Sequence, residues 1–104
     1  MALERVWIGS VTPGRENEHE QFVAWLASDA GHGMFRQYRL DSYELREGDG
    51  KLVVTMRAAE PPIIIHFLRN PRAWPDFWEF KSNAPDDAPA QTELRVRWDV
   101  NESS

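Results

Sequence analysis

The stretch Val6-Trp7-Ile8-Gly9-Ser10-Val11-Thr12-Pro13-Gly14 decides the fold that we expect for this chain. It indicates an apolar strand, at about residues 4–11, that ends at a Pro-Gly turn and leads directly into a helix. Apolar side chains occupy both sides of this strand, with Val6 and Ile8 on one side and Trp7 and Val11 on the other. Strands that are covered on both faces show this pattern. The sequence therefore places the strand inside a layered fold.

Residues 16–29 have the clearest helical periodicity in the chain. At about 100° per residue, one face of this helix collects a buried stripe: His19, Phe22, Val23, Leu26 and Ala30. Glu16, Glu18 and Glu20 place negative charge in the first turns, where the helix dipole favours it. Gly31 and Gly33 are expected to stop the helix. We therefore predict one amphipathic helix against the sheet.

The middle of the chain predicts a hairpin and a second helix. An extended segment over residues 34–46 leads to Glu47-Gly48-Asp49-Gly50, where the Asp-Gly pair is a strong hairpin signal. Residues 51–57 should therefore return antiparallel to the preceding strand. Pro61 and Pro62 can begin a helix, because a proline at the first helical position loses no hydrogen bond. We expect that short helix over residues 63–69.

The C-terminal third contains two further elements and two loops. Residues 72–80 are predicted to add a second helical piece that carries Trp74, Phe77 and Trp78. Residues 82–91 contain several breakers and should form an exposed loop. In residues 94–100, apolar side chains alternate with charged ones, which predicts a half-buried last strand. Residues 101–104 are expected to form a flexible tail.

The predicted order is β-α-β-β-α-β, the ferredoxin-like arrangement of an α+β fold, within a single domain of residues 1–104. Its antiparallel sheet carries the helices on one face. A single layer of helices covers one side of the sheet, so apolar side chains on the other side need a partner. We therefore predict a homodimer through the sheet face.

Composition excludes several classes of protein. The chain has no cysteine, which excludes disulfides and thiolate chemistry, and its net charge of −5 makes nucleic acid an unfavourable partner. The longest apolar run, Ile63-Ile64-Ile65, is far too short to span a membrane. Residues 1–5 lack the pattern of an export signal. We therefore expect a cytoplasmic protein without a membrane partner.

His19 is the first candidate for chemistry, because it lies within an otherwise apolar helix face. An imidazole in this position can act as a general base toward an acidic phenol or enol. The alternative is a histidine that bonds a loop carbonyl at the edge of the core. His32 and His66 share no repeated spacing with His19, so the sequence predicts no metal site.

Aromatic residues indicate a ligand-sized cavity. Five tryptophans in 104 residues favour a wall on which a small apolar or aromatic molecule stacks, although aromatic residues also fill cores. Tyr38 and Tyr43 offer hydroxyl groups, and Arg39 can hold an anionic or enolate oxygen. We assign His19 and Tyr38 to catalysis, and the following residues to substrate binding: Trp7, Trp25, Arg39, Tyr43, His66 and Trp74.

The chain resembles the antibiotic-biosynthesis-monooxygenase domains of the dimeric α+β-barrel superfamily over about residues 4–100. The similar segments are the strand, turn and helix that begin at Val11-Thr12-Pro13-Gly14, then Tyr38-Arg39-Leu40, and then Phe67-Leu68-Arg69-Asn70-Pro71. The resemblance implies two sheets packed face to face across a dimer, with a pocket between sheet and helices in each subunit. Members of the family include oxygenases that use no cofactor.

Two functions stay open at this point. The resemblance implies a cofactor-independent monooxygenase, or a related oxidoreductase, acting on a small aromatic, quinol or polyketide-like substrate. The alternative is a non-catalytic dimeric module that binds a small molecule. Support for this alternative comes from Thr55-Met56-Arg57, which stands where quinol-oxidising members have an acidic-Trp pair that closes the third strand.

Overall fold

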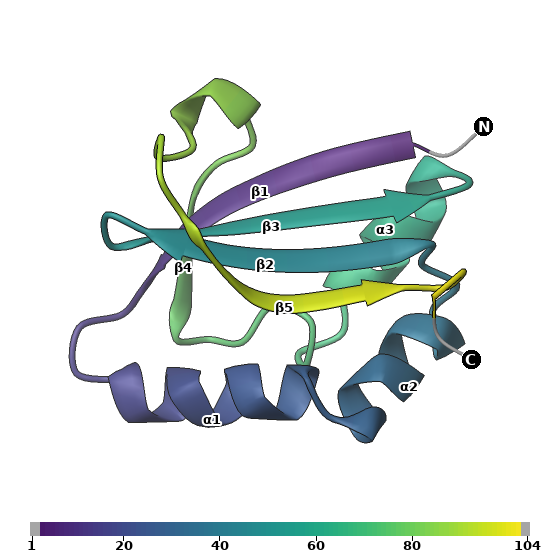
Figure 1. Ribbon diagram of the computed structural model, residues 1–104, viewed down its shortest axis with the longest axis horizontal. Coiled ribbons are helices and arrows are strands. Elements are labelled where there is room, and N and C mark those ends of the chain that lie inside the picture. The colour runs from purple at the N-terminus through teal and green to yellow at the C-terminus, as the bar shows by residue number, and fades with distance from the viewer. Residues whose placement is uncertain (1–2, 103–104) are drawn as a thin grey trace.

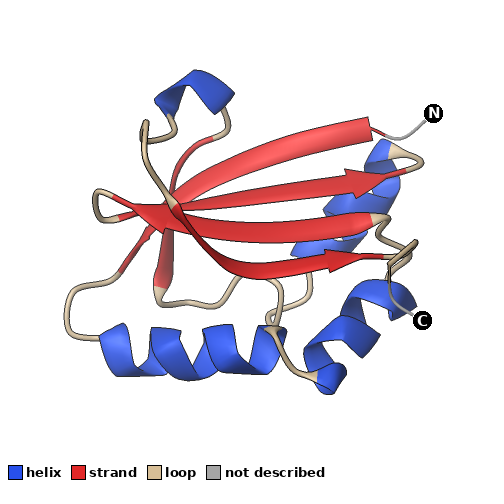
Figure 2. Cartoon of the chain, viewed as in Figure 1, coloured by secondary structure: helices blue, strands red, loops and turns tan. Residues whose placement is uncertain are grey.

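A five-stranded antiparallel sheet organises the computed structural model, which describes residues 3–102. The strands lie in the order β4-β1-β3-β2-β5, and their bounds are β1 Leu3–Val11, β2 Ser42–Gly48, β3 Lys51–Ala58, β4 Trp78–Ser82 and β5 Glu93–Asp99. The helices are α1 Glu16–Leu26, α2 Asp29–Gln37, α3 Pro61–Leu68 and the short 3-10 helix η1 Pro85–Asp87. Figures 1 and 2 show the three α-helices on one side of the sheet and η1 on the other.

The chain has an α+β fold that is compatible with the ferredoxin-like arrangement. Strands β1 and β2 both pair antiparallel with β3, which lies between them, so they run parallel to each other and are joined through helices. The order along the chain is β-α-α-β-β-α-β-β, which corrects the predicted β-α-β-β-α-β. The elements absent from the prediction are the second helix α2 and strand β4, and the predicted last strand over residues 94–100 is present as β5.

The predicted stop at Gly31 and Gly33 is wrong, because both glycines lie inside α2. Ser28 caps this helix, and its hydroxyl accepts a hydrogen bond from the Gly31 N–H at 3.3 Å. A Cβ atom on Gly31 would lie 2.4 Å from the carbonyl oxygen of Trp25. Gly31 thus permits close packing between α1 and α2, and the extended segment predicted from residue 34 begins only at Ser42.

The predicted hairpin and the helix after it are confirmed. Asp49 and Gly50 both have positive φ angles, 51° and 73°, as a type I′ turn requires, and Gly48 pairs with Lys51 across the turn. Helix α3 begins with Pro61, as the two prolines predict. Local turn and breaker signals were therefore sufficient for this part of the chain.

The second helical piece predicted over residues 72–80 is wrong. Trp78 begins strand β4, which pairs antiparallel with β1 through Val11, and the Thr12 N–H donates to the Phe77 carbonyl at 2.8 Å. Trp74, Phe77 and Trp78 have helical spacing in the sequence. The alternation that begins at Trp78 instead places successive side chains on opposite faces of a strand.

One hydrophobic core fills the space between the sheet and the helices. Strand β3 contributes every second residue to it, namely Leu52, Val54, Met56 and Ala58, all nearly inaccessible to solvent. Side chains of α1, α2 and α3 belong to the same cluster. No helix within residues 3–102 is long and apolar enough to cross a bilayer.

The connection from β4 to β5 passes over the opposite face of the sheet. These two strands lie at opposite edges, and η1, midway along the connection, contacts β1 on the side away from the α-helices (Figure 1). Ile8 and Val53 pair on that face and are 0% and 8% exposed. The chain itself thus covers part of the face for which the sequence analysis expected a partner. Residues 103–104 of the predicted tail lie outside the described residues.

Candidate functional site

The predicted site residues lie in two separate places. Tyr38, Arg39 and His66 meet at a surface hollow between the end of α2 and the middle of α3. His19 lies beneath the sheet, near the β2–β3 turn, where it contacts Trp78. The structure therefore divides the residues that the sequence analysis combined into one catalytic pocket.

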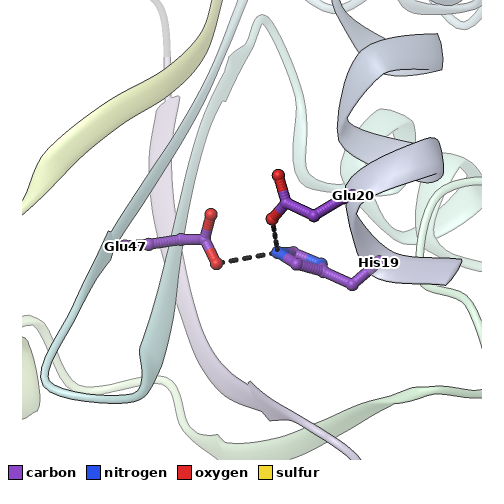
Figure 3. A group of neighbouring side chains, drawn as sticks. All are labelled: His19, Glu20 and Glu47. Carbon is purple, nitrogen blue, oxygen red and sulfur yellow. Dashed lines mark hydrogen bonds and ion pairs between the residues drawn. The ribbon is translucent and has the colours of Figure 1, made fainter. Parts of the chain in front are cut away.

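His19 is held by hydrogen bonds at both ring nitrogens. Its side chain is buried, and the residue is 3% exposed. The Trp78 indole N–H donates to His19 Nδ1 at 2.9 Å, and Glu47 Oε1 lies 2.7 Å from His19 Nε2 (Figure 3). Helix α1, strand β4 and the end of strand β2 thus meet at a single imidazole.

The bonding partners determine which nitrogen of His19 carries the proton. An indole N–H can only donate, so Nδ1 must accept with its lone pair. A neutral imidazole has one donor and one acceptor, so Nε2 carries the hydrogen and donates it to Glu47. No lone pair remains for a substrate proton. This geometry argues against the predicted role of His19 as a general base.

Arg95 forms ion pairs with both carboxylates beside His19. It contacts the second carboxylate oxygen of Glu47, and it also bonds Glu20, which follows His19 on α1. The hydrogen bond from Arg95 lowers the pKa of Glu20, and the bond with Glu20 raises the pKa of Arg95. We call the set Trp78, His19, Glu47, Arg95 and Glu20 the His19 network.

Three residues of the His19 network are also close enough together to resemble a metal site. The ligand atoms of His19, Glu20 and Glu47 lie within 4.8 Å of one another, as metal ligands would (Figure 3). A ligating histidine needs a free lone pair. The Nδ1 lone pair of His19 accepts the bond from Trp78, and Nε2 carries the hydrogen, so neither nitrogen is available to a metal. The guanidinium of Arg95 already forms ion pairs with both carboxylates, in the place that a cation would take. The His19 network therefore does not fit a divalent cation.

Two adjoining hollows form a groove along α2, which we call the α2–α3 groove. The first has a volume of about 410 Å³ and is lined by Gln37, Tyr38, Arg39, Pro62, Ile63 and His66. The second has about 520 Å³; it shares Gln37 and Tyr38 and adds Trp25, Ala30, Gly33, Met34, Asn70 and Arg72. Each volume falls within the range of small-molecule pockets, about 300–1,000 Å³.

Aromatic rings line both parts of this groove. The ring centres of Tyr38 and His66 are 5.2 Å apart, and the edge of Phe67 supports Tyr38 from the core at 5.6 Å. In the second hollow, the Arg72 guanidinium lies 5.9 Å from the ring centre of Trp25. The groove thus combines flat apolar surfaces with cationic side chains.

Trp25 lines the second hollow, whereas the remaining predicted binding residues lie in the core or pack against it. Trp7 packs against the helix-facing cluster, and the Trp74 indole N–H donates to the Trp78 carbonyl at 3.0 Å. Tyr43 is 1% exposed and stacks on Phe35 with ring centres 4.3 Å apart. Burial raises the pKa of its hydroxyl, which has no hydrogen-bond partner among residues 3–102.

Several residues of the α2–α3 groove and of the His19 network were not predicted from the sequence. Pro62 and Ile63 lie four and three residues before His66, a spacing that puts all three on one face of a helix and could have indicated the groove. Glu47 and Arg95 gave no such signal, because only tertiary packing brings them to His19.

The chain was compared with protein-family models, with curated proteins and with solved structures, and nothing matched. The geometry and chemistry of the groove are therefore the basis for assigning a function.

Proposed function

We propose that this domain binds a small planar aromatic molecule in the α2–α3 groove. The observation that carries the proposal is the convergence of Tyr38, Arg39 and His66, from the end of α2 and from α3, on one hollow of ligand size. Planar ligands stack on aromatic rings, and a few polar groups at the rim orient them. This is the non-catalytic alternative of the sequence analysis, placed at a specific surface.

Binding is tested with a panel of planar aromatic compounds, followed by calorimetry and by quenching of tryptophan fluorescence. Tyr38→Ala and His66→Ala should each weaken binding about tenfold, because each removes one wall of the groove. Phe80→Ala is the matched control, since Phe80 is an exposed aromatic residue on β4, outside the groove. Equal affinities in all variants would contradict the proposal.

Catalysis in the same groove is the second candidate. No hydrogen bond joins a ring nitrogen of His66 to another described residue, and the ring lies beside Tyr38. In a cofactor-independent oxygenase, His66 would remove a proton from an acidic CH₂ group and Tyr38 would bond the adjacent oxygen. The carbanion would combine with O₂. One oxygen atom would stay as a carbonyl and the other would leave as water.

Oxygen uptake with anthrones and quinols tests this second candidate. His66→Ala should abolish uptake, whereas a folded His19→Ala variant should retain it, because the His19 lone pair already accepts a bond from Trp78. Binding without oxygen uptake would leave the non-catalytic function in place.

A homodimer through the exposed part of the sheet face remains a proposal. It is supported by Leu94, which is 42% exposed on that face, and by Glu4 and Arg57, which lie opposite each other on adjacent strands and present both signs of charge there. Leu94→Glu should convert the dimer to a monomer in sedimentation at micromolar concentration, and a monomeric wild type would exclude the dimer. A cytoplasmic location also stays a prediction.

A further inference from the structure

We infer that the α2–α3 groove selects an anionic ligand, namely an aromatic carboxylate, and that Arg39 is the residue that determines this specificity. The inference rests on the proposed binding function and adds to it the chemical class of the ligand. Two independent observations support it: the charge of the groove, and the backbone conformation in which Arg39 is held.

The α2–α3 groove lacks the negative charge that is common elsewhere on this chain. Among the described residues 3–102, none that lines its two hollows is acidic, although the chain has 17 acidic and 12 basic residues. Arg39 lies in one hollow and Arg72 in the other. By contrast, Glu47 lines a hollow beside the β2–β3 turn, and Glu44 lines one on the opposite face of the sheet. The groove therefore favours an anion.

Arg39 occupies a backbone position that normally favours glycine. Its φ angle is 65°, in the left-handed region, directly after the end of α2. The Leu40 N–H donates to the Phe35 carbonyl at 3.1 Å and the Arg39 N–H to the Arg36 carbonyl at 3.0 Å, which together form a Schellman motif. A residue with a Cβ atom is strained in this conformation. The helix end itself gives no reason for an arginine here.

The side chain of Arg39 is free to meet a ligand. It is exposed, and no hydrogen bond or ion pair joins it to another residue within the described range 3–102. A guanidinium presents parallel N–H groups that match both oxygens of a carboxylate. Arg39 directly follows Tyr38 and lines the same hollow as His66. A ring stacked on Tyr38 and His66 can therefore place its carboxylate at Arg39.

The test compares naphthalene carboxylate with the corresponding naphthyl alcohol and naphthyl phosphate, by calorimetry on the whole chain. For the wild type, we expect the carboxylate to bind at least about tenfold more tightly than the alcohol, as a charge-assisted bond provides. In Arg39→Gly this ratio should fall to about one, because the charge-assisted bond that only the carboxylate can make is lost. Arg57→Gln is the control, because Arg57 lies outside the groove, and it should retain the preference.

Thermal unfolding provides a second readout on the same variant. Arg39→Gly should raise the melting temperature by roughly a few degrees, because glycine relieves the left-handed strain. A variant that is more stable and yet loses the carboxylate preference cannot be explained by misfolding. A lower melting temperature would contradict the argument from the backbone.

The outcomes separate this inference from the proposed function. If the wild type binds the alcohol and the carboxylate equally, or if Arg39→Gly keeps the preference, the inference fails while binding of planar aromatic molecules stands. Tighter binding of the phosphate than of the carboxylate would overturn the assignment to carboxylates. If none of the three compounds binds, both the inference and the proposed function fail.

Discussion

The same two residue types occur in two regions of this molecule and do opposite things there. His19 and Tyr43 lie in the core beneath the sheet, where they are 3% and 1% exposed. His66 and Tyr38 lie in the α2–α3 groove, with their rings 5.2 Å apart. The chain has no other tyrosine and one further histidine. The two pairs therefore show how burial and neighbouring groups change what the same side chains can do.

The difference shows that burial of a histidine is poor guidance to catalysis. In the core, Trp78 and Glu47 use both nitrogens of His19, so the ring joins three elements of the fold. In the groove, the His66 ring is exposed on α3. Only a histidine with an available lone pair can exchange a proton with a ligand.

The largest expected effect is on the stability of His19→Ala. This change removes a buried ring and leaves the Trp78 indole N–H without its acceptor, so we expect a loss of roughly 3 kcal/mol in the free energy of unfolding. His66→Ala is the matched control on an exposed site and should change stability by less than about 0.5 kcal/mol. Urea denaturation measures both. Equal losses would remove the distinction between the two regions.

A smaller loss is expected for Trp78→Phe, which keeps an aromatic ring but removes the N–H donor to His19. The unpaired Nδ1 should reduce the free energy of unfolding by about 1–2 kcal/mol. Nitrogen NMR of the wild type should show Nδ1 of His19 unprotonated and Nε2 protonated. A proton on Nδ1 would refute the bonding pattern assigned to the His19 network.

Tyr43→Phe should stabilise the protein by about 1 kcal/mol, because the buried hydroxyl has no hydrogen-bond partner among residues 3–102. Tyr38→Phe in the groove should change stability by less than about 0.5 kcal/mol. Thermal and urea unfolding of the two variants compare them directly. A loss of stability in Tyr43→Phe would show that the hydroxyl is bonded in solution.

The buried hydroxyl of Tyr43 also predicts how stability depends on pH under alkaline conditions. Burial raises the pKa of Tyr43 in the folded state, so the unfolded chain releases this proton first. The contribution of Tyr43 to the free energy of unfolding is therefore constant below about pH 10, and this free energy falls as the pH rises above that value. Tyr43→Phe should show a smaller fall than the wild type.

The smallest expected effect concerns Glu20 at the rim of the His19 network. Arg95 lowers the pKa of Glu20 in the folded state, so its contribution is present at neutral pH and is lost as pH falls below roughly 4. The Glu20 side chain is 57% exposed, so we expect only a few tenths of a kcal/mol. Glu20→Gln should reduce the acid dependence of unfolding by that amount. An acid dependence that is the same in Glu20→Gln and in the wild type would contradict this contribution.

Elements with local signals could be predicted from the sequence. The Asp49-Gly50 turn and the start of α3 at Pro61 depend on the conformations that individual residues prefer, so the sequence was sufficient. Gly31 was misjudged because a glycine that breaks a helix and a glycine that permits close packing of helices look alike in a sequence. Ser28 followed by Asp29 was the helix-start signal that could have separated the two cases.

The candidate site was predicted less well than the fold. Tyr38, Arg39 and His66 line one surface hollow between α2 and α3, whereas His19, which was assigned to the same pocket, is buried beneath the sheet. Its partner Trp78 lies on strand β4, which was predicted to be a helix because Trp74, Phe77 and Trp78 have helical spacing. Contacts between distant segments decide the state of a buried histidine, and no local pattern reports them.

The connection from β4 to β5 also determines the order in which the two edges of the sheet are completed. Strand β4 completes one edge of the sheet, but the opposite edge receives β5 only after residues 83–92 have crossed the other face. A folding chain therefore holds β2 as an open edge until β5 has paired with it. Val96 and Trp98 then close the core as the final step, so a truncated translation product should be prone to aggregation.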